Sequence, residues 1–336
     1  LPYVKTPGIL NMFRTWEKIT TLDLGLEMRL LDSRLSAELG YFNRRSWDII
    51  GPPTPKAAVL GTSAPQVNNA EFTTKGFEMQ LSWRDQINEK WDYSASLNLA
   101  DARSKITKYN TSSNSFGQTS DGKEKWYVGK EFGEIWGYKA ERFLTKDDFD
   151  ENGKLLVDQS KIHANWYPGD VKYEDLNGDG EITPGNSTVE EPGDKRIIGN
   201  STPRFRYGIN LSTGYEFEKA GRLDLSLFFE GVAKRDVFMN GSFFFWGTGV
   251  SNSFASSVFN NDKHMDFYRD ETTEARLLEY MGENINSYFP RPYDNAEGNK
   301  NFQASTKYLL NGAYIRLKNL QLTYTLPKHL ISKVGM

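Results

Sequence analysis

Strict alternation of apolar and polar residues is the feature that most constrains how this chain can fold. From Leu22 to Leu30 every second residue is apolar, and none of the residues between them is. Trp91 to Leu99 repeats the pattern, and so does Phe205 to Phe217 apart from Thr213. Side chains alternate between the two faces of a β-strand, so this pattern indicates strands with one apolar face. Counted in this way, the sequence predicts seven strands, at about 20–31, 34–46, 71–84, 91–104, 204–217, 222–234 and 312–326.

The last of these strands changes phase. Its apolar residues follow one parity up to Leu317 and the other from Leu320 onward. An extra residue inserted into one strand of an antiparallel pair has this effect, so we expect a β-bulge between the two leucines.

The connections between the predicted strands alternate between short and long. Short turns are expected at Asp32–Ser33, at about 85–90 and at about 218–221, and long segments at about 47–70, 104–203 and 235–311. The strands are roughly as long as tilted membrane-spanning strands and longer than is usual in soluble sheets. Tight turns on one side and large loops on the other are typical of outer-membrane barrels. We therefore predict an all-β fold, an antiparallel up-and-down transmembrane β-barrel with long extracellular loops.

Composition excludes several other classes of protein. The chain has no cysteine, which rules out a disulfide scaffold and a thiolate metal site. Its net charge is −3 without a basic stripe, which argues against a nucleic-acid binder. Mean hydropathy is −0.62 and no run of about 18 apolar residues occurs, so no transmembrane helix is expected. Barrel strands need only every second residue to be apolar, so a barrel is compatible with this composition.

A series of short motifs resembles the C-terminal barrel of the SusC/RagA family of TonB-dependent outer-membrane transporters. The motifs occur in the family's order and span nearly the whole chain. They are Trp16–Lys18 leading into Leu22–Leu30, Tyr41–Ile50, Asn68–Ala70, Lys75–Glu78, Gly133–Tyr138, Pro168–Gly180, Ile198–Phe205, Phe229–Val232, Tyr314–Leu320 and Tyr324–Pro327.

The resemblance implies a large plugged barrel of about 22 strands, of which this chain would be the later third. It implies TonB-dependent import of an oligosaccharide or an oligopeptide across the outer membrane of a Gram-negative, Bacteroidetes-type bacterium. A SusD-like surface lipoprotein would form the lid, the TonB complex would act through the plug, and dimers of transporter–lipoprotein pairs would be compatible with it. The chain starts at Leu1 without a signal peptide, so the plug and the other strands are expected outside it. The polar parity of each strand should face the lumen and the apolar parity the lipid.

One motif has the residues of a calcium loop. Asp175, Asn177 and Asp179 supply oxygen ligands at positions 1, 3 and 5 of an EF-hand-like turn, and Glu181 would supply a backbone carbonyl at position 7. Position 12, usually a bidentate acid, is Asn186. The family pattern would give the closing role to Asp194, although an insertion containing Glu190 and Glu191 intervenes. The alternative is a metal-free Asx-turn loop.

Aromatic residues in the predicted loops are candidates for contact with substrate or lid. Flat rings facing a lumen could stack on sugars or on peptide side chains, or they could simply pack the loops together. The candidates are Trp47, Trp126, Trp136, Trp166, Tyr167, Phe244 and Trp246.

Catalytic motifs are missing from the sequence. His163, His264 and His329 are scattered, and no zinc spacing, nucleophile elbow or P-loop occurs. The chain is therefore expected not to be an enzyme. The alternatives to import are a soluble β-sandwich that binds glycans through loop tryptophans, a secreted glycan-cleaving enzyme and a passive porin.

Overall fold

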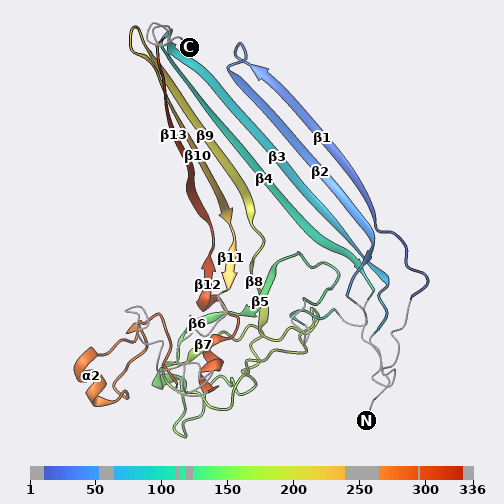
Figure 1. Ribbon diagram of the computed structural model, residues 1–336. Coiled ribbons are helices and arrows are strands. Elements are labelled where there is room, and N and C mark those ends of the chain that lie inside the picture. The colour runs from blue at the N-terminus through green and yellow to red at the C-terminus, as the bar shows by residue number, and fades with distance from the viewer. Residues whose placement is uncertain are drawn as a thin grey trace, which may run out of the picture.

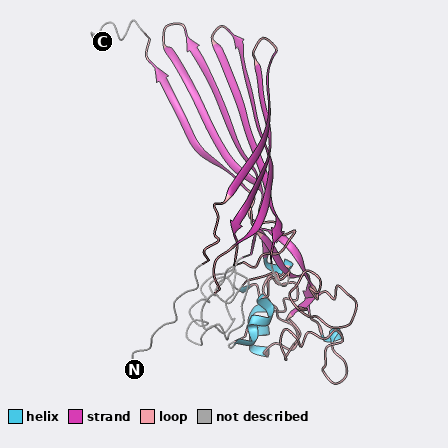
Figure 2. Cartoon of the chain, turned by 90° about the vertical axis from the view of Figure 1, so that its right-hand side faces the viewer, coloured by secondary structure: helices cyan, strands magenta, loops and turns pink. Residues whose placement is uncertain are grey.

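The computed structural model describes residues 11–52, 64–110, 114–118, 124–238, 265–293 and 296–327. They form one long, twisted antiparallel sheet and a packed group of loops at one of its ends (Figures 1 and 2). The sheet has seven strands in the order β1-β2-β3-β4-β9-β10-β13. Their bounds are β1 Lys18–Leu30, β2 Leu35–Ile50, β3 Asn68–Asn88, β4 Trp91–Tyr109, β9 Arg204–Phe217, β10 Gly221–Lys234 and β13 Tyr314–Thr325.

Each predicted strand overlaps one strand of this sheet, and several strands run further than the alternation indicated. β2, β3 and β4 extend further toward the loop end, where apolar and polar residues no longer alternate strictly. The turn expected at about 85–90 is shorter than predicted, because β3 continues to Asn88 and β4 starts at Trp91.

The register of the sheet separates two chemical faces. Cα partners place Met28, Ala37, Leu81, Leu97, Ile209, Phe229 and Leu317 in one continuous row across all seven strands. The neighbouring row, on the opposite face, consists of Glu27, Glu38, Gln80, Asn98, Gly208, Glu230 and Arg316. We call the apolar side of the sheet the outer face and the polar side the inner face.

The outer face is exposed although it is apolar. Leu22, Leu24 and Leu26 are 56%, 59% and 52% exposed, and Leu320 and Leu322 are 59% and 63% exposed. A β-sandwich would cover such a face with a second sheet. The described part of the chain places no second sheet there, so the antiparallel sheet is confirmed and the sandwich alternative is not supported.

Aromatic side chains border this apolar band at both ends. Trp91, Tyr215, Phe217 and Tyr324 lie near the tight turns, and Tyr41, Phe77 and Tyr207 lie toward the loops. Indole and phenol rings combine an apolar body with a polar tip and gather at membrane–water boundaries. At the border near the tight turns, the Trp91 indole donates to Thr213 Oγ1 at 2.7 Å.

The bulge expected in the last strand is confirmed. Phe228 pairs with Asn319 and Phe229 pairs with Leu317, so Lys318 is the extra residue. The bulge keeps Leu317 and Leu320 on the same outer face despite their odd spacing.

Tight turns join the strands at one end of the sheet, and the long segments leave from the other end (Figure 1). The β1–β2 turn places Leu31, Asp32 and Ser33 at positive φ, between 55° and 64°. The arrangement of connections is the one that the sequence predicts.

The long segments are not open loops but fold into a body with a core of its own. We call this the loop body: the described residues of 124–203, 235–238 and 265–311. Its apolar core consists of Tyr138, Phe143, Leu144, Trp166, Val171, Tyr173, Ile182 and Tyr268. Its short elements are β5 Glu134–Tyr138 with β8 Lys195–Asn200, β6 Ala140–Phe143 with β7 Val171–Tyr173, β11 Asp236–Phe238 with β12 Leu309–Asn311, α2 Ala275–Met281, and the 3-10 turns Lys146–Asp148, Ala296–Phe302 and Thr306–Tyr308. No helix in the described ranges is long and apolar enough to cross a membrane.

Candidate functional site

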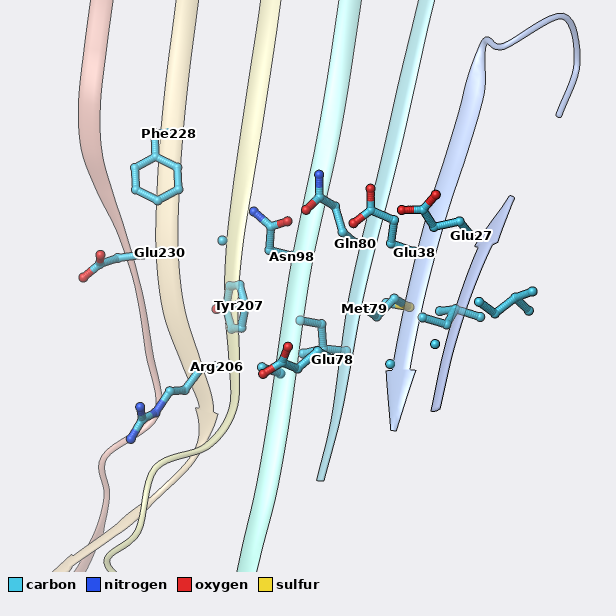
Figure 3. Close-up of a pocket in the computed structure, with 17 residues that line it drawn as sticks. Glu27, Glu38, Glu78, Met79, Gln80, Asn98, Arg206, Tyr207, Phe228 and Glu230 are labelled. Atoms are coloured by element: carbon cyan, nitrogen blue, oxygen red, sulfur yellow. The ribbon is translucent and has the colours of Figure 1, made fainter. Parts of the chain in front are cut away.

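The inner face presents a row of polar side chains in register. Glu27, Glu38, Gln80 and Asn98 stand side by side on β1 to β4, and Glu230 continues the row on β10 (Figure 3). They share a face because each is the direct Cα partner of the next, with Gly208 between Asn98 and Glu230. The row lines a hollow of about 910 Å³ together with Glu78 and Arg206.

The acidic residues that line the hollow differ in whether a cation neutralises them. Glu230 accepts from Arg316 Nε at 2.8 Å and lies 3.5 Å from Lys318 Nζ. Among the described residues, Glu27, Glu38 and Glu78 form no ion pair. The row therefore offers free carboxylate acceptors and amide donors, which suit a polar solute passing over the face.

Two phenylalanines interrupt the polar chemistry of the inner face. The Phe42 ring lies across Gly76, where an added Cβ would come within 2.5 Å of the ring, and the Phe228 ring lies across Gly208 at 3.2 Å. Each pair is directly cross-strand or diagonal in register. The rings give the inner face two flat apolar surfaces.

These two residues were not among the sequence candidates. Phe42 follows Tyr41 and Phe228 precedes Phe229, so both parities are apolar at these points and alternation cannot tell the faces apart. The glycines opposite them, Gly76 and Gly208, are the signal that could have identified them, because glycine in a strand often marks a close approach.

A buried ion pair joins the two long segments of the loop body. Lys300 Nζ lies 2.7 Å from Asp170 Oδ2, and neither side chain has exposed surface. Asp170 also accepts from the Tyr293 hydroxyl and from Asn301 Nδ2, both at 2.8 Å, and from the backbone N–H of Tyr167 at 2.9 Å. Each lone-pair direction of the carboxylate is thus used, which is what a buried charge requires.

Aromatic rings surround the lysine of this pair. The Lys300 ammonium lies 4.5 Å from the ring centre of Tyr293, 4.9 Å from that of Tyr167 and 5.4 Å from that of Trp166. It donates to the backbone carbonyl of Asn165 at 2.8 Å. Burial lowers the pKa of Lys300, and Asp170 opposes that shift. Burial and the neighbouring Asp170 carboxylate both raise the pKa of Tyr293.

The structure separates the candidate aromatics into packing and accessible residues. Trp166 is 8% exposed, lies in the core and donates to the carbonyls of Gln159 and His163, so its role is packing. Trp136 is stacked on Phe116 at 4.0 Å, and Trp126 contacts Tyr109 and Phe132 edge to face. These contacts agree with the packing alternative for all three tryptophans.

Two other candidates keep accessible ring surface. Tyr167 is 42% exposed and lies 5.9 Å from the Arg291 guanidinium. Trp47 is half-buried at the loop end of β2, with Arg45 over its ring at 5.3 Å. Phe244 and Trp246 lie outside the described residues.

The Asp175 loop is closed by hydrogen bonds. Asp175 accepts from the backbone N–H groups of Gly178 at 2.7 Å and Gly180 at 2.8 Å, and Gly180 has the positive φ of 83° that a tight turn needs. Asp179 accepts from the Glu181 N–H at 2.8 Å. These bonds hold the pKa of Asp175 below its usual value. The three side-chain oxygens of Asp175, Asn177 and Asp179 suit calcium in chemistry.

The proposed closing ligand, Asp194, has a different use in the structure. It has no exposed surface, and its two oxygens accept from the N–H groups of Leu176 at 2.9 Å and Thr183 at 2.6 Å, one on each side of the loop. Asp194 therefore fastens the base of the loop. Within the described ranges no group of three or more His, Cys, Asp or Glu side chains is arranged to hold a metal ion. Calcium binding thus stays a prediction.

Sequence comparison relates this chain to receptors of one class. It is 27% identical over 328 residues to TonB-dependent receptor P3 of Formosa agariphila, covering 96% of this chain and 28% of that protein. TonB-dependent receptor P26 of the same organism is 23% identical, with coverage of 96% and 28%. No protein-family model matches the chain. At coverages of 28%, the chain spans less than a third of the length of these two receptors.

Comparison of structures shows a shared fold. The fold matches the RagAB peptide transporter with a TM-score of 0.62 and 20% identity, covering 94% of this chain and 30% of that chain. The RagAB peptide importer in its open-open state matches with a TM-score of 0.63 and 21% identity, at coverages of 94% and 29%. The names of these relatives describe receptors and a transporter rather than an enzyme.

Proposed function

Because the chain is a homologue of the TonB-dependent receptors, which are outer-membrane β-barrel proteins, and its sheet matches part of the RagAB transporter fold, we propose that it forms part of the wall of an active importer. The cargo is an oligopeptide or an oligosaccharide too large for a porin. Energy comes from the TonB complex, acting on a plug encoded outside residues 1–336.

One observation carries this proposal: the same seven strands have an exposed apolar outer face and a polar inner face in strict register. Lipid is the medium that an exposed apolar band with aromatic borders fits, and a water-filled lumen is the medium that the opposite face fits. β1 and β13 each lack a partner on one side within the described sheet. Open edges cannot face lipid, so further strands of the whole protein must pair with them.

The inner face offers the groups that a solute would contact as it passes through the lumen. The free carboxylates Glu27, Glu38 and Glu78 accept hydrogen bonds from amide or hydroxyl groups, while Phe42 and Phe228 offer apolar contact. Many weak contacts of mixed type allow a solute to bind and to leave, as transport requires.

The loop body lies on the extracellular side in this proposal, because long loops of such barrels are external. Its exposed Tyr167 and the adjoining Arg291 are candidates for contact with a SusD-like lipoprotein that closes the barrel as a lid. The two-component names of the RagAB structures support a lid partner. The cell would be a Gram-negative bacterium of Bacteroidetes type.

Calcium in the Asp175 loop would have a structural role. Asp175, Asn177 and Asp179 would hold the ion, and it would stiffen an external loop whose base Asp194 already fastens. No step of transport depends on the ion.

Uptake by cells tests the proposal. Cells producing the full-length protein are given fluorescently labelled mixtures of oligopeptides and of oligosaccharides, with and without an uncoupler of the proton-motive force. We expect accumulation of one of the two mixtures, and we expect the uncoupler to abolish it. Equal uptake in the presence of the uncoupler would mean a passive porin, and no uptake of either mixture would contradict import of these classes.

A further inference from the structure

Basic side chains gather on the outer face just beyond the apolar band, on the loop side. The last apolar row contains Leu24, Tyr41 and Phe77, and the next outer row contains Leu22, Asn43, Lys75 and Arg103. The row after that contains Thr20, Arg45, Thr73 and Lys105. We call Arg45, Lys75, Arg103, Lys105 and Lys108 the basic belt.

The belt borders a hollow of about 640 Å³ on the outer face. Tyr41 and Phe77 line the side of the hollow next to the apolar band, and Lys75, Arg103 and Lys105 line the other side. The hollow is therefore apolar toward the middle of the sheet and charged toward the loops. Four cations line it there, Lys75, Arg103, Lys105 and Arg204, against the two acids Asp101 and Glu131.

Part of the belt's charge has no internal partner. Arg45 and Lys108 share Glu71, at 2.8 and 3.5 Å, and Arg103 has Glu131 at a loose 3.8 Å. Asp101, which also lines the hollow, forms an ion pair with Arg204. Lys75 and Lys105 are exposed and form no ion pair with the described residues. Free cations thus remain beside the hollow.

The inner face at the same height is different. The row opposite the belt is Thr21, Arg44, Thr74 and Ser104, in which Arg44 donates to Thr21 and Thr74 bonds with Ser104. If the cations served a solute in the lumen, they would be on this face. Their concentration on the lipid-facing side indicates a ligand at the membrane surface.

We propose that the basic belt binds a phosphorylated lipid of the outer leaflet. Lys75, Arg103 and Lys105 hold the phosphate, since clustered basic groups at a membrane boundary attract anionic headgroups and guanidinium matches phosphate geometry. The acyl chains lie along the apolar band below Tyr41 and Phe77. The inference rests on the proposed function, because it needs the sheet to be inserted with its loops outside.

Binding of a purified lipid tests the inference. The full-length protein in detergent is titrated with phosphorylated lipid A, with the same lipid after removal of its phosphates, and with inorganic phosphate. The test variant is K75Q/R103Q/K105Q, and the matched control is R29Q/R44Q/R84Q, which removes equal charge from the inner face. A heat-modifiable band on gels shows that each variant has folded.

We expect wild type and control to prefer the phosphorylated lipid, and the test variant to bind it at least about tenfold more weakly. Equal binding of the two lipids by wild type, or unchanged binding by the test variant, would overturn the inference while leaving import untouched. Competition by inorganic phosphate as strong as that by lipid A would also overturn it, in favour of a free-phosphate site. A full-length protein absent from the membrane fraction would contradict the proposed function itself.

Discussion

Lys300 is a charged residue with no access to water, and its position explains why two distant segments fold as one body. Its ammonium group meets Asp170, 130 residues earlier in the chain, and three aromatic rings close around it. Tyr173 adds a bond from its hydroxyl to the Lys300 carbonyl at 2.8 Å, and Val171 donates to Asn301 at 2.8 Å. Nothing local in the sequence marks this pair, because its partners come together only when both segments fold.

Removal of one partner of the pair should loosen the loop body. We expect Lys300→Met to lower its local free energy of unfolding by about 3 kcal/mol, because Asp170 is left as a buried charge without its cation. Hydrogen–deuterium exchange at the amides of Val171 and Tyr173 in β7 measures this. Glu271→Gln is the matched control: it breaks another ion pair between the two segments, with Lys146 at 2.7 Å, whose side chains are 56% and 62% exposed. That change should cost less than about 1 kcal/mol, and equal effects of the two variants would contradict the assignment.

Asp148 should make the loop body sensitive to acid. Burial alone would raise its pKa, but hydrogen bonds from Arg142, Thr145 and Lys172 outweigh burial and hold the pKa below its ordinary value of 3.8. The unfolded state therefore binds a proton more readily than the folded state, so stability is present above the ordinary pKa and is lost as pH falls below it.

The measurement for Asp148 is thermal unfolding followed by tryptophan fluorescence between pH 6 and pH 3. We expect the midpoint temperature of the wild type to decrease once the pH drops below about 4. The midpoint temperature of Asp148→Asn should be lower than that of the wild type at pH 6 and should change less with pH. Parallel pH profiles for the two proteins would show that Asp148 is not the group responsible.

The Asp175 loop gives a separate test at the same scale. If the loop holds calcium, adding the ion to chelator-treated protein should raise the midpoint of thermal unfolding, and Asp175→Asn should remove most of the rise, because a neutral ligand weakens a hard-cation site. Asp147→Asn, an acid in the first turn of Lys146–Asp148, is the control and should keep the response. No response in the wild type would mean that the bonds to Asp194 close the loop alone.

At the scale of elements, alternation located the strands because each strand has one apolar and one polar face. It also located the bulge at Lys318, since a bulge is the physical means by which a strand changes phase without changing faces. It fell short at the loop ends of β3 and β4, where the predicted strands begin at about 71 and end at about 104 but β3 begins at Asn68 and β4 continues to Tyr109. The inward orientation of Phe42 and Phe228 could not be predicted, because each lies next to another aromatic residue and alternation then does not indicate which of the two faces inward.

Adjacent residues of one strand should differ sharply in tolerance to charge. Leu81 on β3 faces outward in the middle of the apolar band, and Gln80 faces inward. We expect Leu81→Lys to lower the free energy of unfolding of the full-length protein in lipid vesicles by about 2–4 kcal/mol, and Gln80→Lys to change it little. Urea titration checks both variants, and equal costs would contradict the assignment of faces.

At the scale of the whole molecule, the sheet and the loop body differ in how far the sequence predicts them. The sheet supplies a wall whose two faces are decided by parity, and this part could be predicted from the sequence together with the resemblance to SusC/RagA transporters. The loop body and the sites on it depend on contacts between residues more than 100 positions apart, such as Tyr293 with Asp170 and Asn165 with Glu297. Such contacts leave no periodic signal, so Trp166 could be named as a candidate but not placed in the core.

The central claim is that one sheet separates lipid from a water-filled lumen, and a pair of single cysteines tests it most directly. The chain contains no cysteine, so Leu97→Cys on the outer face and Asn98→Cys on the inner face of β4 differ only in side. In a cysteine-free background, outer-membrane vesicles carrying either full-length variant are treated with a charged, water-soluble maleimide. We predict rapid labelling at position 98 and protection at position 97, with labelling at 97 appearing after the vesicles are dissolved in denaturant. Equal labelling of both positions in intact vesicles would contradict the account.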